Sequence, residues 1–150
     1  LEELGLAPAL KMLASDLEIA TGVHFSQHGP PRRLRPEAEI ALYRIAQEAL
    51  NNAWQHSAAP DVWLEVSFAP DHVTITIRDN GQGFKAPRQA SDLPDMAPGH
   101  FGIMGMYERA SLIGAHLQIQ STPAQGTQVT VSLPLPLQPE EGESLSPNAR

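Results

Sequence analysis

The fold of this chain is decided by Val73-Thr74-Ile75-Thr76-Ile77-Arg78-Asp79-Asn80-Gly81-Gln82-Gly83-Phe84. Its first six residues alternate apolar and polar side chains, which predicts a strand with one buried face. Such a strand would hold Asp79 rigidly at its end, where a carboxylate can accept a hydrogen bond from an exocyclic amine. Gly81 and Gly83 would let the backbone approach a flat ring closely. The competing interpretation is an Asp-Asn-Gly turn that closes a hairpin.

A long helix is predicted upstream, over residues 36–57, from apolar and small residues at i, i+3 and i+4 spacing. These residues are Leu42, Ile45, Ala46, Ala49, Leu50 and Ala53. A neighbouring face carries the polar column Arg44, Glu48, Asn52 and His56. Polar columns are usually solvated surface, but the pair Asn51-Asn52 is unfavourable inside a helix and therefore suggests a function. The amide oxygen of Asn52 would suit Mg²⁺, which takes one or two protein oxygens beside phosphates.

Glycines open a third element, Gly99-His100-Phe101-Gly102-Ile103-Met104-Gly105-Met106. A helical pattern follows over residues 103–113, so the unpaired N–H groups at its start could bind a phosphate. The spacing matches neither a P-loop nor a Rossmann fingerprint. Taken alone, a segment of this kind is more often a flexible hinge before a helix.

Four motifs, in this order, resemble the ATP-binding domains shared by histidine kinases, Hsp90, gyrase B and MutL. They are Glu48-x-x-x-Asn52, Asp79-x-Gly81-x-Gly83, Gly102-x-x-Gly105 and Gly126-Thr127. Four ordered motifs are much harder to match by chance than one. Longer stretches are similar to the sensor histidine kinases that include the nitrate sensors and the thermosensor of membrane fluidity; they are residues 43–53, 102–110 and 126–131. The resemblance covers residues 1–134.

The resemblance implies a role for each residue at the adenine end of the site. Asp79 would bind the adenine amine, usually with a water, and Thr127 would lie near the same edge. Gly81 and Gly83 would shape the floor beneath the adenine.

At the phosphate end the resemblance implies that Asn52 coordinates Mg²⁺ and that Asn51 lines the same helix face. Gly102 and Gly105 would present backbone groups to the phosphates. His56 could donate to a phosphate oxygen, although a surface histidine near a helix C-terminus is the alternative.

Three residues leave the chemistry open. Glu48 stands where the ATPase relatives carry the general base that activates water. A kinase must not lose the γ-phosphate of ATP to hydrolysis, so the role of Glu48 stays open.

Gln55 and Met104 replace basic residues that many relatives carry, which favours a second hypothesis, a regulatory nucleotide-binding module without transfer activity. A third hypothesis is an anti-sigma-factor serine kinase on the same fold, against which the helix with Glu108-Arg109 argues.

The expected fold is α+β, a two-layer α/β sandwich of the Bergerat type. Its mixed sheet of about five strands would be covered on one face by three helices. The strands are expected at residues 62–68, 73–78, 116–121 and 127–133, with an edge strand at 23–26, and the helices at 8–20, 36–57 and 103–113. Residues 1–8 resemble the junction after the dimerisation helices, 85–101 the ATP lid, and 135–150 a disordered acidic tail.

Composition bounds the function further. Among 150 residues, 10 are basic and 17 acidic, which argues against a nucleic-acid surface. The absence of cysteine excludes disulfides and cysteine-ligated zinc, and it is compatible with the cytoplasm, with or without a membrane anchor on the parent protein. The start at Leu1 suggests a fragment of a longer protein.

The expected function is the catalytic ATP-binding domain of a two-component sensor histidine kinase, with ATP and Mg²⁺ as cofactors. None of the six histidines precedes Asp or Glu, so the phosphoacceptor histidine should lie upstream, in the dimerisation helices of the same kinase. A response regulator would receive the phosphate. The parent protein would be a homodimer and this fragment a monomer.

Overall fold

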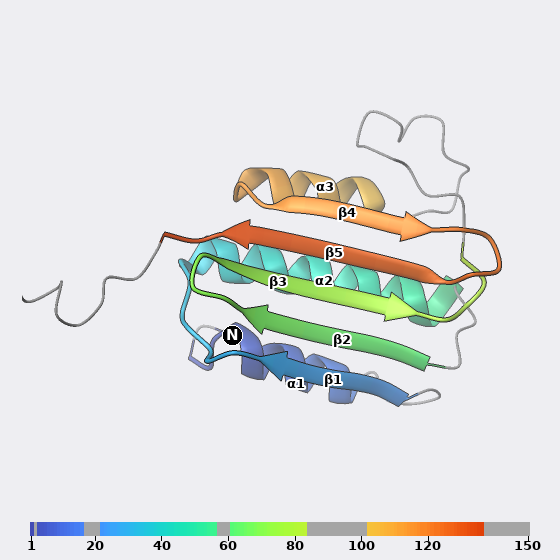
Figure 1. Ribbon diagram of the computed structural model, residues 1–150, viewed down its shortest axis with the longest axis horizontal. Helices are drawn as coiled ribbons and strands as arrows, with labels where there is room; N and C mark the ends of the chain where they lie inside the picture. Colours follow the sequence, from blue (N-terminus) through green and yellow to red (C-terminus); the bar gives the residue numbers. More distant parts are fainter. Residues whose placement is uncertain (2, 17–21, 57–60, 84–101, 137–150) are drawn as a thin grey trace, which may run out of the picture.

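The structure is a computed structural model that describes residues 1, 3–16, 22–56, 61–83 and 102–136. This part of the chain forms two layers, a five-stranded sheet and three helices that cover the same face of it (Figure 1). The helices are α1 (Leu6–Asp16), α2 (Pro36–His56) and α3 (Ile103–Leu112). The strands are β1 (Gly22–His28), β2 (Asp61–Phe68), β3 (His72–Asp79), β4 (His116–Ser121) and β5 (Thr127–Pro134). The predicted α+β sandwich is confirmed.

The sheet has the order β1-β2-β3-β5-β4. Strand β1 runs parallel to β2 at one edge, and every other pair is antiparallel, so the sheet is mixed as predicted. The strand that follows β3 in the chain is β4, which lies beyond β5. The interpretation of Asp79-Asn80-Gly81 as a turn that closes a hairpin is therefore wrong, because the chain leaves the sheet there and passes through α3 before it returns.

The core lies between the sheet and α2. Alternate residues of β3 point into it, and Val73, Ile75 and Ile77 are all at most 2% exposed. All six residues of the predicted helical stripe are buried against them, led by Leu42 and Ile45 at 0%. Burying one such side chain contributes about 1.5–3 kcal/mol. This shared core fixes the position of α2 relative to the end of β3.

Two boundaries differ from the predicted ones. Helix α1 begins at Leu6, and Leu6 and Ala7 are buried, so residues 6–8 belong to the first helix although they were predicted as a junction. Pro8 is tolerated there because the first turn does not need its N–H. At the other end the N–H of Leu135 donates to the carbonyl of Asp71 (2.8 Å), which holds the chain against the sheet beyond residue 134. Residues 17–20, the ATP lid at 85–101 and the tail from 137 lie outside the described part.

The connection between β1 and α2 contains an ion pair in which the carboxylate is buried and the arginine is exposed, and the sequence did not suggest it. Glu39 is 2% exposed and accepts hydrogen bonds from Nε and Nη2 of Arg33, each at 3.1 Å. It also accepts from the N–H of Leu34 at 3.2 Å. A neighbouring cation, Arg35, donates to the carbonyl of Ile113 at the end of α3 (2.6 Å). These contacts fix the N-terminal end of α2, far along the helix from Asn52.

Among the described residues no helix is long and apolar enough to span a membrane.

Candidate functional site

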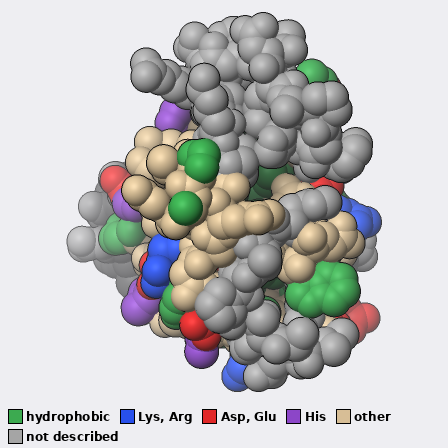
Figure 2. Space-filling view, turned by 90° about the vertical axis from the view of Figure 1, so that its right-hand side faces the viewer, with side chains coloured by type: hydrophobic (Ala, Val, Ile, Leu, Met, Phe, Trp, Pro, Cys, Tyr) green, Lys and Arg blue, Asp and Glu red, His purple; other side chains and the backbone are tan. Residues whose placement is uncertain are grey.

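The predicted site residues converge at one end of the sheet. Strand β3 ends there, β5 begins there, α2 ends there and α3 begins there, at the right of Figure 1. Figure 2 looks onto this end, and backbone and uncharged polar groups make up much of its middle. Motifs that are up to 79 residues apart, Glu48 and Thr127, are thus brought to one place by the topology.

Asp79 is the most buried polar group of the site, with 6% of its surface exposed. It continues the series Val73, Ile75 and Ile77 and therefore lies on the face of the sheet that the helices cover. Its Oδ1 accepts the N–H of Gly81 at 2.9 Å, and the N–H of Thr127 also donates to the carboxylate. Burial raises the pKa of the Asp79 carboxyl above the usual range of an aspartate, and these two hydrogen bonds lower that pKa in part. The result is a fixed, largely dry acceptor.

Thr127 lies directly opposite Asp79 in the β3–β5 pairing. Its hydroxyl is 2.8 Å from Oγ of Ser121 on β4, and Ser121 also donates to the carbonyl of Gly126 at 3.0 Å. Gly126 has φ +85°, and a Cβ on it would lie 2.3 Å from the carbonyl oxygen of Asp79. The turn between β4 and β5 is therefore packed closely onto the end of β3.

The glycine segment after Asp79 packs against the same turn. The N–H of Ala124 donates to the carbonyl of Gln82. Gly83 has φ +67°, and a Cβ there would lie 2.2 Å from the carbonyl oxygen of Thr122. Only glycine fits such a contact, so Gly83 has a structural role in addition to the ligand role that was predicted for it.

Helix α2 contributes Glu48, Asn51 and Asn52, which are all partly buried. Within the described part, neither asparagine side chain has a hydrogen-bond partner in the protein. No group of three or more histidine, aspartate or glutamate side chains that could hold a metal ion is found among the described residues. A Mg²⁺ ion at Asn52 would therefore depend on phosphate oxygens and water for its other ligands. His56 ends α2, and its side chain, like His100, lies outside the description.

The start of α3 touches α2 through Gly102 and Glu48. Gly102 has φ +83° at the N-cap, and a Cβ on it would lie 2.3 Å from Cδ of Glu48. Its carbonyl accepts the N–H of Met106 at 2.8 Å, which begins the helix. Gly105 lies in the first turn of the same helix. The sequence predicted both motifs, but not this direct contact between them.

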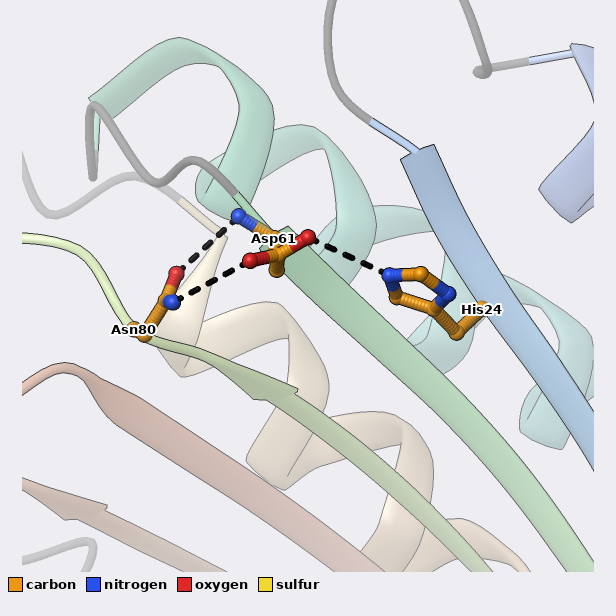
Figure 3. A network of polar contacts seen from close by, with 3 residues as sticks. All are labelled: His24, Asp61 and Asn80. Atoms are coloured by element: carbon orange, nitrogen blue, oxygen red, sulfur yellow. Dashed lines mark hydrogen bonds and ion pairs between the residues drawn. The ribbon is translucent and has the colours of Figure 1, made fainter.

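A polar network beside Asp79 was missed (Figure 3). Oδ1 of Asn80 accepts the N–H of Asp61 at 3.0 Å, and Nδ2 of Asn80 is 3.4 Å from Oδ2 of Asp61. The other carboxylate oxygen of Asp61 is 3.2 Å from Nε2 of His24. His24 lies on β1, Asp61 begins β2 and Asn80 directly follows β3, so no spacing in the sequence could have revealed them.

Solved structures share this fold. The histidine kinase domain of a blue-light activated kinase from Erythrobacter litoralis EL346 superposes with a TM-score of 0.67 at 21% identity, covering 87% of this chain and 61% of that one. The ATP binding domain of PrrB from Mycobacterium tuberculosis has a TM-score of 0.62 at 20% identity, covering 89% and 96%. At 20–21% identity these likenesses show the fold, a two-layer α+β domain.

Residues 37–137 match the family described as Histidine kinase-, DNA gyrase B-, and HSP90-like ATPase, and the chain belongs to this family. Membership implies that it binds ATP. It is 36% identical to the histidine-protein kinase/phosphatase DegS of Brevibacillus brevis, over 90% of this chain and 34% of DegS. It is also 36% identical to the sensor histidine kinase YhcY of Bacillus subtilis, over 89% of this chain and 33% of YhcY. The chain therefore spans about a third of these curated relatives. The narrower resemblance to the nitrate sensors and the thermosensor stays a prediction.

The contact between Gly102 and Glu48 predicts a position-specific response to alanine. Gly102→Ala should lower the free energy of unfolding by about 2 kcal/mol, because it adds left-handed strain and overlaps Glu48. Gly105→Ala should raise it by about 0.5–1 kcal/mol, because that glycine is helical and only the flexible end of Arg109 is near. Urea unfolding of both variants measures the difference. In a Glu48→Ala background the cost of Gly102→Ala should fall to about 1 kcal/mol; an unchanged cost would contradict the contact.

The raised pKa of Asp79 predicts a pH dependence of stability. The folded chain holds the Asp79 proton more tightly than the unfolded chain, so this group's contribution to stability falls as the pH rises from the ordinary aspartate pKa to the raised one. Urea unfolding of wild type and Asp79→Asn from about pH 3 to about pH 8 isolates this group. The free energy of unfolding of wild type minus that of the variant should decrease through this window and then level off. An increase with pH would contradict the burial of an ionisable Asp79.

Proposed function

We propose that this chain is the catalytic ATP-binding domain of a two-component sensor histidine kinase. It binds Mg-ATP and donates the γ-phosphate to a histidine outside this chain, in the dimerisation helices of the same kinase. A response regulator then receives the phosphate. The observation that carries the proposal is the buried Asp79 carboxylate, held by two backbone N–H groups at the meeting point of the family's motifs.

Asp79 would recognise the adenine base. An adenine 6-amino group can donate to a carboxylate whose position is already fixed, and the low exposure of Asp79 makes that hydrogen bond stronger than it would be in water. Thr127 lies across from Asp79 and would contact the same edge of the base. Gly81 and Gly83 would form the floor beneath it, since backbone without side chains admits a flat ring.

The phosphate end would be formed by α2 and α3. Asn52 would contribute an amide oxygen to Mg²⁺, Asn51 would line the same face, and His56 would donate to a phosphate oxygen. Gly102 and Gly105 would turn the backbone N–H groups of the start of α3 toward the phosphates. Bound Mg²⁺ would supply charge neutralisation of the phosphates. The protein's own contribution is positioning, as is usual in phosphoryl transfer.

Glu48 has a different place in this scheme. Its carboxyl lies against Gly102, so it ties α2 to the start of α3. It would position the phosphate-binding backbone, and a role as a general base toward water is not part of the proposal.

A second candidate is a regulatory module that binds nucleotide and transfers nothing. Two observations favour it: Gln55, near the end of α2, carries no charge, and Met104, in the first turn of α3, is an exposed apolar side chain. A phosphate end with fewer cations binds the triphosphate more weakly.

Calorimetric titration with ATP, with and without Mg²⁺, tests the assignment. Wild type should bind ATP and bind it more tightly with Mg²⁺. Asp79→Asn should weaken binding at least about 100-fold, because a charge-assisted hydrogen bond and its geometry are lost. Asn52→Ala should retain binding but lose the Mg²⁺ dependence.

A kinase assay separates the two candidate functions. The chain is mixed with a separate polypeptide that carries the dimerisation helices of the parent kinase. Labelled phosphate on the histidine of those helices supports the kinase. Binding of ATP without transfer supports the regulatory module, and no binding at millimolar ATP contradicts both.

A further inference from the structure

Asn80 directly follows β3 and is the first residue beyond the paired part of that strand. Asp79 is the last residue of β3 that pairs with both neighbours, Val62 on β2 and Thr127 on β5. Beyond a paired strand the backbone is ordinarily free to move. Here it is not, because Asn80 and Asp61, the first residue of β2, share three hydrogen bonds of 3.0, 3.4 and 3.4 Å.

The partner of Asn80 is itself held in place. Oδ1 of Asp61 is 3.2 Å from Nε2 of His24 on the edge strand β1. The ring of His24 stacks on Trp63, with centroids 5.6 Å apart, and the guanidinium of Arg78 lies 3.9 Å above the same Trp63 ring. The contacts thus run from β1 through Asp61 on β2 to Asn80, and Figure 3 shows the three residues His24, Asp61 and Asn80.

The position of Asn80 controls a hydrogen bond inside the site. Asn80 is the single residue between Asp79 and Gly81. The N–H of Gly81 donates to the Asp79 carboxylate at 2.9 Å. A shift of residue 80 would therefore turn this donor away from Oδ1 of Asp79 and remove one of the two backbone hydrogen bonds that orient the carboxylate.

We propose that Asn80 is a positioning residue of the nucleotide site, which clamps the backbone between Asp79 and Gly81 against Asp61 and so holds the carboxylate in the orientation that receives the adenine amine. The inference rests on the proposed function, because it assumes that Asp79 contacts the adenine amine. It adds a residue that touches no nucleotide atom and acts through Asp79.

The two side-chain hydrogen bonds to Asp61 explain why an asparagine suits position 80. The Asn80 amide accepts from the Asp61 N–H with its oxygen and donates to the Asp61 carboxylate with its nitrogen. Aspartate at position 80 would keep the first bond but place two carboxylates side by side. Exchanging the two side chains, as Asn80→Asp with Asp61→Asn, restores one amide and one carboxylate facing each other.

The test compares two nucleotides on the 150-residue chain. ATP is titrated beside purine riboside triphosphate, which lacks the 6-amino group, against wild type, Asn80→Ala, Asn80→Asp and the exchanged double variant. Asn80→Ala and Asn80→Asp should bind ATP about tenfold more weakly, and the riboside less than about twofold more weakly. The double variant should return to within about threefold of wild type for ATP.

Three results would overturn the inference. They are an unchanged ATP affinity in Asn80→Ala, an equal loss for both nucleotides, and no recovery in the exchanged variant although its urea midpoint matches wild type. Asp79→Asn is run beside them. If that variant binds ATP as wild type does, the adenine contact of the proposed function fails; if it loses binding while Asn80→Ala does not, only the positioning role fails.

Discussion

Strand β3 is hydrogen-bonded to β2 on one side and to β5 on the other, from Val73 through Asp79. A strand paired on both sides cannot shift its register without moving every alternate side chain to the wrong face. The buried residues Ile75 and Ile77 therefore fix the side on which Asp79 lies. Because Asp79 is the last residue of this ladder, the same pairing that builds the core aims its carboxylate into the layer beneath the sheet.

Close backbone packing then assembles the rest of the site around that carboxylate. Gly126 and Gly83 lie so near neighbouring carbonyl oxygens that no side chain fits, and Gly102 lies against Glu48 in the same way. Each contact joins two segments that are distant in the sequence. Gly83 and Gly102, which were assigned to the ligand, thus also hold the elements of the site together, so changing them would alter folding as well as binding.

Much of this arrangement follows from short-range patterns in the sequence. Alternation in β3 and the i, i+3, i+4 stripe in α2 predict the buried faces correctly, because each element must bury one face. The four ordered motifs give the family. Strand order does not follow from the residues alone: the hairpin at Asp79-Asn80-Gly81 was locally reasonable, and only the pairing of β5 with β3 excludes it.

The missed residues share one physical property. Glu39 resembles an ordinary acidic residue in the first turn of a helix, where it would complement the helix dipole from the surface. Only the approach of Arg33 and the Leu34 N–H makes its burial possible. Asn80 resembles a turn residue until Asp61 is placed beside it. In both cases the hydrogen-bond partner is brought near only by the tertiary structure, and the spacing of residues in the sequence does not reveal it.

The central claim is that nucleotide binds at the Asp79 end of the sheet. Backbone amide chemical shifts of the ¹⁵N-labelled chain, recorded while Mg-ATP is added, test it most directly. The account predicts that the N–H signals of Gly81 and Thr127, which donate to Asp79, move with the largest changes, while those of Ala69 and Leu135 at the opposite end stay in place. Shifts confined to the opposite end, or none at saturating Mg-ATP, would contradict it.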